Sequence, residues 1–332
     1  MSTTRRKLLT SGAAALTALA GAGVTSRLFG RGKAETPVAS RAPKTAREIE
    51  RVLSASSEHW VGDGFRVRSV ISPNGDPILQ SPFLLLDHAA RRYFEPAALR
   101  RGVGEHPHRG FETVTFAYRG EIQHRDSSGG GGLIGPGDVQ WMTAAGGLVH
   151  EEMHSHEFTA RGGELEMVQL WVNLPAKSKL STPGYQPLLG KDFPRLTLGA
   201  ARARLIAGKL GAASGPARTH TPITVFDLEF GETGETQFAL PSGWNSLLFN
   251  LEGDVRVGAH GRPLRPGDLA RLDPRSGGRV HVQGVERSRV LVLSGEPIAE
   301  PIAAYGPFVM NTQAEIQQAI EDYRSGKMGR LG

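Results

Sequence analysis

Two stretches of this chain repeat the same order of turn residues at nearly the same spacing. In the first stretch Gly120 follows an apolar strand pattern and a Pro-Gly-Asp turn begins at Pro136, and in the second Gly253 and Pro266 hold the same places. The glycines lie 133 residues apart and the prolines 130 residues apart. Proline presets φ and glycine supplies a positive φ, so each copy is typical of tight hairpin corners. The repeat predicts a duplicated small β-barrel.

The segments around these turns have the composition of β-strands, and residues 65–71 also alternate apolar and polar residues at a period of two. Clear examples are residues 65–71, 113–118, 166–174, 223–230 and 246–251. Glycine and proline together make up 64 of the 332 residues, which favours short strands joined by turns. Because strands do not alternate with helices, we predict an all-β antiparallel fold rather than a parallel α/β sheet.

Four segments are expected along the chain. They are an export signal (1–34), a linker with a short helix (35–64), a first barrel (65–185) and a second barrel with a terminal helix (186–332). The short helix is expected because three apolar residues fall on one helical side, namely Ile49, Val52 and Leu53. The terminal helix is expected from a capping box, an apolar face and a glycine stop, namely Thr312 with Glu315, then Ile316, Ala319, Ile320 and Tyr323, then Gly326.

The first 34 residues have the composition of an export signal. Arg5 and Arg6 precede an uncharged run rich in alanine and glycine, which resembles a twin-arginine signal. The run falls short of the stretch of roughly 20 strongly apolar residues that a membrane helix needs. We therefore expect a periplasmic protein with no stable membrane insertion after cleavage at Ala22 or Ala34, with an uncleaved anchor as the alternative.

Charge and cysteine content exclude several classes of function. Without its leader the chain carries 33 basic and 33 acidic residues, so it has no general electrostatic reason to bind nucleic acid. The absence of cysteine excludes disulfides, iron–sulfur clusters and cysteine nucleophiles. Any bound metal must therefore use histidine, carboxylate or water ligands.

Six of the eleven histidines lie close together in the sequence, namely His106, His108, His124, His150, His154 and His156. In a strand His106 and His108 point to the same side, and so do His150 and Glu152. Two such pairs on neighbouring strands predict a metal site with three imidazoles and one carboxylate. This donor set suits Fe(II), with Mn, Ni, Co, Cu or Zn as competitors.

Other residues near these pairs leave alternatives open. Glu112 stands four residues after His108, on the same face of an uninterrupted strand, and is either a rival ligand or a hydrogen-bond partner of a ligand imidazole. We expect His154 and His156 to be solvated loop residues, with extra ligands as the alternative. The second half of the chain holds isolated histidines, so we expect its barrel to be metal-free; they are His220, His260 and His281.

Several stretches of the sequence, including the histidine motifs, resemble the pirin family of the cupin superfamily. The resemblance lies in residues 81–88, 106–113, 136–144, 170–174, 300–302 and 305–312, and it spans 65–329. It implies a bicupin, with two antiparallel β-barrels and one metal in the first. It implies four ligands, which are His106, His108, His150 and Glu152. Other cupins often take the carboxylate from the first motif, which here would be Glu112.

The resemblance also implies an activity. It points to a monomeric metal-dependent dioxygenase, with Fe(II) as the expected metal and with O₂ and a quercetin-like flavonol, or a related phenol or enol, as substrates. Ring opening of such a flavonol releases carbon monoxide, and Glu152 is the expected base. A non-enzymatic metal- or redox-responsive binding protein of the periplasm is the alternative, and zinc-dependent isomerase or hydrolase chemistry is a third. The export signal departs from the family, whose members are typically intracellular.

Overall fold

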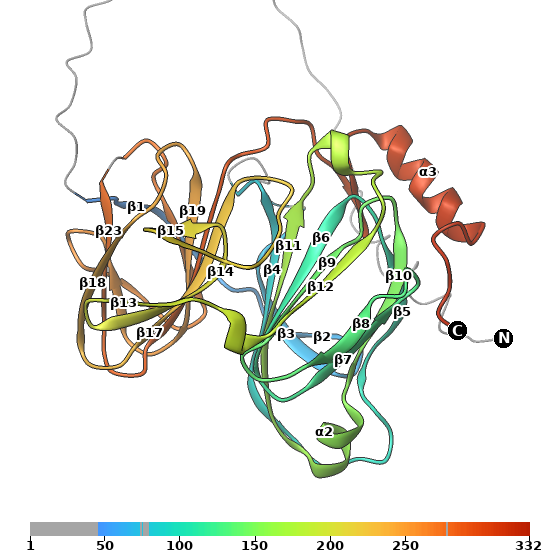
Figure 1. Cartoon of the computed structure of the whole chain (residues 1–332), viewed down its shortest axis with the longest axis horizontal. Helices are drawn as coiled ribbons and strands as arrows, with labels where there is room; N and C mark the ends of the chain where they lie inside the picture. Colours follow the sequence, from blue (N-terminus) through green and yellow to red (C-terminus); the bar gives the residue numbers. More distant parts are fainter. Residues whose placement is uncertain (1–45, 74, 76–79, 277) are drawn as a thin grey trace, which may run out of the picture. The chain divides into compact units, whose positions relative to one another are not determined.

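The computed structural model describes residues 46–73, 75, 80–276 and 278–332. These residues form two antiparallel β-barrels followed by a C-terminal helix, which confirms the all-β bicupin class (Figure 1). The expected export signal at 1–34 lies outside the described residues. Among the helices of the described part, none is both long and apolar enough to cross a membrane.

The first barrel consists of two sheets. The larger sheet has, in spatial order, β12 (Gly184–Leu188), β9 (Val139–Thr143), β6 (Phe111–Arg119), β11 (Gly163–Asn173), β4 (Phe83–Phe94), β3 (Phe65–Ile71) and β2 (His59–Val61). The smaller sheet has β5 (Gly102–His108), β10 (Leu148–His154), β7 (Ile122–Asp126) and β8 (Gly131–Ile134). Neighbouring strands pair antiparallel in both sheets.

The second barrel repeats this architecture. Its larger sheet has β1 (Ile49–Ser54), β22 (Asp268–Leu272), β19 (Asn245–Glu252), β24 (Arg289–Gly295), β17 (Ile223–Phe230), β14 (Ala201–Ala207) and β13 (Arg195–Leu198). Its smaller sheet has β18 (Gly234–Ala239), β23 (Arg279–Gly284), β20 (Val255–Val257) and β21 (Arg262–Leu264). Apart from the edge strands β1 and β12, matching strands occupy matching places in the two barrels, as the repeated turns predict.

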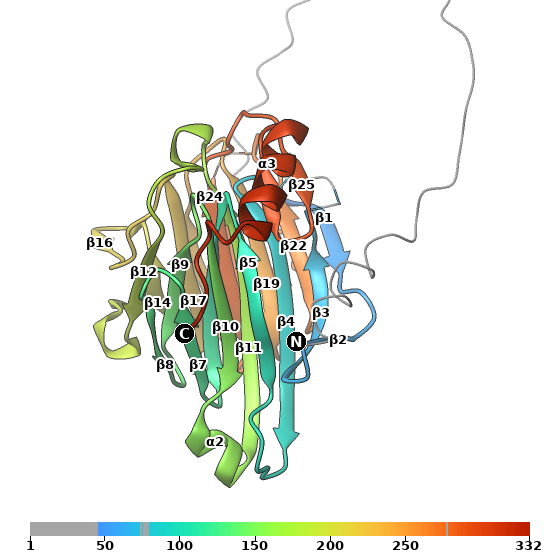
Figure 2. The same ribbon diagram turned by 90° about the vertical axis from the view of Figure 1, so that its right-hand side faces the viewer.

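Shorter elements complete the structure. They are α2 (His156–Arg161), η2 (Ala176–Ser178), η3 (Gly190–Asp192), β15 (Lys209–Leu210), β16 (Ala213–Ser214), β25 (Ala303–Tyr305), β26 (Phe308–Met310) and α3 (Gln313–Arg324). The predicted capping box of Thr312 and Glu315 is present at the start of α3. The inner side of α3 packs with Val149 of β10 and with β26, so the helix covers the outside of the first barrel. Figure 2 shows the C-terminal segment lying over this side.

The prediction of a short helix in the linker is wrong, because this segment forms strand β1. β1 pairs antiparallel with β22 and so becomes an edge strand of the second barrel. Val52 packs on the interior of that barrel, whereas the next residue, Leu53, packs on the core between the barrels. Neighbouring side chains on opposite faces are a property of a strand. The free edge of β22 offers backbone partners that an isolated short helix lacks, so tertiary pairing decides the conformation.

The two larger sheets pack against each other through a continuous apolar core. The first barrel contributes Phe116 and Trp141, and the second contributes Phe249 and Leu291. Residues one position along these strands point the other way, so that Leu248 fills the interior of the second barrel. This alternation fixes which side chains of the first barrel face its own interior.

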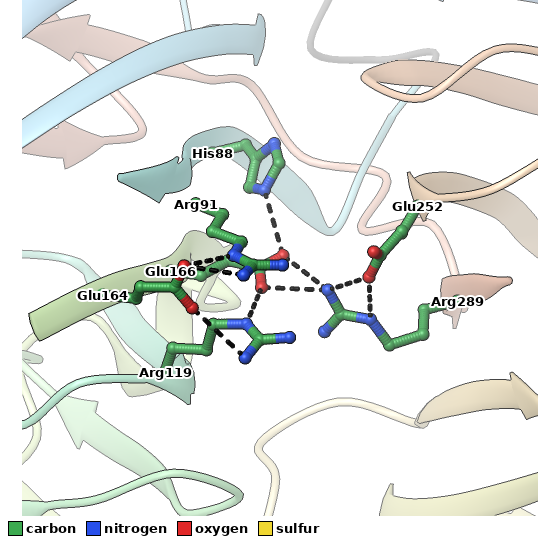
Figure 3. A network of polar contacts seen from close by, with 7 residues as sticks. All are labelled: His88, Arg91, Arg119, Glu164, Glu166, Glu252 and Arg289. Carbon is green, nitrogen blue, oxygen red and sulfur yellow. Dashed lines mark hydrogen bonds and ion pairs between the residues drawn. The ribbon is translucent and has the colours of Figure 1, made fainter. Parts of the chain in front are cut away.

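A network of charged side chains crosses the same contact between the barrels (Figure 3). At its centre Glu166 of β11, which is buried, lies 2.8 Å from Nη2 of Arg289 on β24. Arg119 of β6 and His88 of β4 approach the same carboxylate at 3.5 and 3.8 Å. Burial would raise the pKa of Glu166, but hydrogen bonds and the charge of Arg289 outweigh burial and hold that pKa below its ordinary value. The carboxylate therefore holds the barrels together in its ionised form.

Candidate metal centre

The three histidines predicted as ligands come together inside the first barrel. β5 carries His106 and His108, and β10 carries His150 directly opposite His106. Pro107 separates the two β5 histidines and cannot donate to a ladder, which is tolerated because β5 is the edge of its sheet. One ligand atom from each of the three side chains lies within 4.8 Å of the other two.

The hydrogen bonds of these histidines show which ring nitrogens carry a lone pair that is available to a metal ion. Nδ1 of His106 lies 2.8 Å from the carbonyl oxygen of Gly104, and Nδ1 of His108 lies 3.4 Å from that of Pro307. A carbonyl oxygen only accepts, so both Nδ1 atoms donate and the lone pairs fall on Nε2. Nε2 of His150 is buried and has no hydrogen-bond partner. These orphaned acceptors are the arrangement that a metal ion would satisfy.

The electrostatics of the cluster favour neutral imidazoles. Burial lowers the pKa of His106, and burial together with the charge of neighbouring histidines lowers the pKa of His108 and His150 well below the ordinary value. A neutral imidazole is the form that ligates a metal. The residues present therefore fit a divalent ion of the first transition series, which tolerates nitrogen ligands.

Glu152 faces the same interior as His150 but is not among the three side chains whose ligand atoms gather within 4.8 Å. Its carboxylate accepts hydrogen bonds from Thr115, Gln140 and Gln169, which come from three strands of the opposite sheet. Burial raises the pKa of this carboxyl group. The structure thus places Glu152 across the barrel interior, held by neutral donors beside the histidine cluster.

Glu112 points out of the barrel interior, in contrast to the same-face expectation. Its carboxylate accepts a 2.7 Å hydrogen bond from Thr143, and its even-numbered neighbour Val114 belongs to the core between the barrels. The alternation is broken at Gly110, where φ is +88° and where a Cβ would lie 1.9 Å from the carbonyl oxygen of Val309. The strand is therefore interrupted, and parity counted from His108 does not reach Glu112. Burial raises the pKa of Glu112 to about 7.

The two histidines that follow the second motif have separate environments. His154 is not a solvated residue, because it is buried against aromatic rings and its Nε2 lies 3.0 Å from the carbonyl oxygen of Gly64. β10 continues through this position, so His154 faces inward like His150. His156 is exposed at the start of α2, as expected. Neither belongs to the group of ligand atoms.

In the second barrel the matching strands carry apolar side chains and one threonine at their inward positions. β18 and β23 correspond to β5 and β10, and their paired inward residues are Phe238 with Val280 and Thr236 with Val282. The isolated histidines of this half of the chain lie elsewhere and are not in any group of potential ligands among the described residues; they are His220, His260 and His281. The metal-free second barrel stays a prediction with a structural rationale.

Sequence patterns did not assign a role to a second pair of polar residues next to the cluster. Nε2 of His124 lies 3.1 Å from Oδ2 of Asp126, and Nδ1 of His124 lies 3.3 Å from Nδ1 of His150. The His124 ring stacks on Tyr185 of β12, with centroids 5.0 Å apart and planes inclined by 12°. The signal that could have indicated this pair is its i, i+2 spacing on β7, next to β10.

A buried lysine and the C-terminal segment support the rim of the site. Nζ of Lys179 donates to the carbonyl oxygens of Gly110 and Val309 and to Oδ1 of Asn173, at 2.7–2.9 Å. Burial lowers the pKa of Lys179 to about 7. The Pro307 carbonyl that accepts from His108 belongs to the same segment as Val309. The contacts of Lys179 with Val309 and of His108 with Pro307 join residues 130 and 199 positions apart, so local sequence patterns do not reveal them.

Comparisons with known proteins agree with this architecture. The family models described as Pirin and as Pirin C-terminal cupin domain match residues 64–172 and 225–329. A Pseudomonas aeruginosa protein named "putative quercetin 2,3-dioxygenase" is 49% identical over 286 residues, which is 86% of this chain and 99% of the relative. Pirin of Homo sapiens is 36% identical over 279 residues, 82% of this chain and 91% of the relative.

Solved structures show the same similarity. A crystal structure of quercetin 2,3-dioxygenase from Acinetobacter baumannii is similar with a TM-score of 0.83 and 46% identity, covering 86% of this chain and all of that one. A bacterial pirin from Escherichia coli, crystallised in complex with nickel(II), is similar with a TM-score of 0.55 and 18% identity, over 75% of this chain and 99% of that one. The latter supports the fold.

Proposed function

Because this chain belongs to the pirin family of cupin proteins, we propose that it is a metal-dependent dioxygenase acting on a quercetin-like flavonol or a related phenol or enol. The names of the relatives from P. aeruginosa and A. baumannii support this substrate class and O₂ as co-substrate. The observation that carries the proposal is the convergence of three imidazoles, two buried and one half-buried, with free Nε2 lone pairs.

We propose His106, His108, His150 and Glu152 as the residues that hold the ion. Three neutral imidazoles and one carboxylate suit Fe(II), and Zn, Mn, Ni, Co and Cu are its competitors. When bound, the ion would act as a Lewis acid toward an enol or phenol oxygen and would bring O₂ beside it. The neutral histidines would leave most of its charge available for an anionic ligand.

The chain's own side chains would bind and deprotonate the substrate. Trp171 packs against His108 and against the fully buried ring of Phe111, with the Phe111 and Trp171 ring centroids 4.2 Å apart, and its partly exposed side chain would offer an apolar surface to a flat aromatic ring. Glu152 would accept the proton of the substrate hydroxyl, because its oxygens face the interior next to His150. Thr115 and Gln169 would keep that carboxylate in place through their hydrogen bonds.

Metal analysis followed by O₂ uptake tests the proposal. Protein loaded with Fe(II) should consume O₂ and release carbon monoxide in equal amounts when quercetin is added. His150→Ala should lose bound metal and turnover, whereas His154→Ala, which removes a buried histidine outside the cluster, should keep both. Metal binding without O₂ uptake across a set of phenols and enols would indicate a non-enzymatic metal-binding protein, and a wild type that binds no metal would contradict the proposal.

We also propose that the protein is exported to the periplasm through a twin-arginine-type signal. The support is the sequence of residues 1–34, in which Arg5 and Arg6 precede an alanine-rich uncharged run. A periplasmic location would bring the site into contact with small molecules that enter from outside the cell.

A further inference from the structure

A chain of hydrogen-bonding groups leads away from the histidine cluster into the smaller sheet of the first barrel. Asp126 and His124 lie on the same face of β7, and β7 pairs with β10, which carries His150. All three side chains are buried. The proposed function gives no role to His124 or Asp126, although burying a histidine and a carboxylate is unfavourable unless they are paired.

The donors around Asp126 fix the direction of its hydrogen bonds. Oδ1 accepts from the backbone N–H groups of Ser128 and Gly130, at 2.8 and 3.0 Å, and from the Ser128 hydroxyl at 2.6 Å. A carboxylate held in this way is an acceptor at both oxygens, so Oδ2 accepts from Nε2–H of His124. A Cβ on Gly130 would lie 2.4 Å from Oδ2 of Asp126, so the turn after β7 packs closely against the carboxylate.

The proton on Nε2 of a neutral His124 leaves its Nδ1 as an acceptor. Nδ1 of His150, 3.3 Å away, is then the donor. The remaining nitrogen of His150, Nε2, carries the lone pair, and it is the buried atom without a hydrogen-bond partner. The proton positions along the whole chain therefore follow from the one fixed acceptor at its end.

We infer that His124 and Asp126 are positioning residues that hold His150 in the tautomer and orientation needed to bind a metal through Nε2, an inference that rests on the proposed metal site. His106 and His108 are held in the same way by backbone carbonyl oxygens, which accept a hydrogen bond from their Nδ1 atoms. His150 has no such carbonyl among its described contacts, and the His124–Asp126 pair supplies the acceptor instead. Tyr185 keeps the His124 ring in its plane by stacking on it.

His124 is not itself a further ligand. The atom of His150 that it contacts is Nδ1, on the opposite side of the ring from the free Nε2. His124 is also absent from the group of ligand atoms within 4.8 Å of one another. Partners of this kind, which orient a ligand imidazole, typically change metal affinity by about 10–100-fold when they are removed.

Two substitutions at one position separate the hydrogen bond from the packing. His124→Phe keeps a flat ring against Tyr185 but removes the acceptor for His150. His124→Asn loses the ring and places an amide oxygen near the position of Nδ1, so it keeps an acceptor. His154→Phe is the matched control, because it makes the same change at a buried histidine of the same barrel that lies outside the cluster.

Co(II) titration, followed by its visible absorption, measures the effect on full-length protein. We expect His124→Phe to weaken Co(II) binding by about 10–100-fold and to alter the ligand-field spectrum. His124→Asn should recover part of the affinity, and His154→Phe should bind like the wild type. Equal Co(II) affinity and spectra for His124→Phe and His154→Phe would overturn the inference while leaving the metal site intact.

Nitrogen NMR of the metal-free wild type reports the histidine tautomers directly. This measurement does not depend on whether any variant folds. The inference requires His150 to carry its proton on Nδ1 and His124 to carry its proton on Nε2. The opposite tautomers would overturn it whatever the variants show. A wild type that has these tautomers but binds no Co(II) would contradict the proposed metal site and not the hydrogen-bonded chain.

Discussion

Two buried glutamates stand close to the histidine motifs in the sequence, but only one shares their face of the barrel. Glu152 receives its hydrogen bonds from inward-facing side chains such as Gln169, whereas Glu112 is bonded to Thr143 on the outward face. Both are buried and both accept from a threonine hydroxyl, so they form a natural pair for comparison. The direction of the side chain, and not its chemistry, distinguishes them.

We predict that Glu152→Gln removes metal and activity and that Glu112→Gln does not. Glutamine keeps the shape of Glu152 but lacks the anionic oxygen that would ligate the ion and accept the substrate proton, so metal affinity should fall by about 100-fold or more and turnover should be lost. Metal content and O₂ uptake of the two variants, measured side by side, check this. An empty site in Glu112→Gln with a loaded site in Glu152→Gln would assign the ligand to the first motif.

Lys179 shows how an irregular segment can support a site built on strands. It follows η2, and its ammonium group connects the bend at Gly110, just after His108, to the C-terminal strand β26 through Val309. Burial of an ammonium group is tolerated only when its donors are satisfied, and here all three of them have an oxygen acceptor.

Lys179→Met should therefore lower the free energy of unfolding by about 3 kcal/mol, because it leaves three buried acceptors without their donor. Denaturant unfolding of the metal-free protein measures the change. Lys327→Met is the control, since Lys327 pairs with Asp322 at the surface and should contribute less than about 1 kcal/mol. Equal losses for the two variants would show that the buried contacts of Lys179 add nothing.

The charged contact between the barrels makes the stability of the whole protein depend on pH. The pKa of Glu166 is lower in the folded protein than its ordinary value. Its contribution to stability is therefore fully present above the ordinary glutamate pKa of about 4.3 and is lost as the pH falls through the lower folded-state pKa. Unfolding this contact separates sheets from both halves of the chain.

We predict that Glu166→Gln destabilises the protein by about 2–3 kcal/mol at neutral pH, because Arg289 would lose its buried charged partner and keep only the more exposed Glu252. The loss should shrink as the pH falls below 4, where the wild type also loses the negative charge. Glu164→Gln is the control on the same strand, since Glu164 is more exposed where it meets Arg91 and Arg119 (Figure 3). Denaturation at several pH values should separate the two, and parallel curves for both variants would contradict the prediction.

The proposed export signal concerns the molecule as a whole. If residues 1–34 act as a twin-arginine signal, replacing Arg5 and Arg6 together by lysine should leave full-length precursor in the cytoplasm. Cell fractionation and immunoblotting in the native host measure this. Undiminished periplasmic delivery of the double-lysine form would contradict a twin-arginine route.

Short-range sequence patterns were sufficient to predict the two barrels, the shared face of two histidines and the start of the terminal helix. The repeated glycine and proline turns predicted two barrels because they define hairpin corners locally. The spacing of His106 and His108 predicted that both imidazoles share a face because a strand alternates its side chains. The capping box at Thr312 predicted the start of α3 from interactions within four residues.

The tertiary structure decided what depends on partners distant in the sequence. Strand β1 exists because the edge of β22 accepts it, and Glu112 faces outward because the chain bends at Gly110. Pro307 orients His108 from 199 residues away. His124 gains a role only because β7 pairs with β10, and no local pattern specifies which strands become neighbours. Local sequence patterns thus predicted the candidate ligands, whereas the contacts that orient these side chains come from strand pairing and long-range packing.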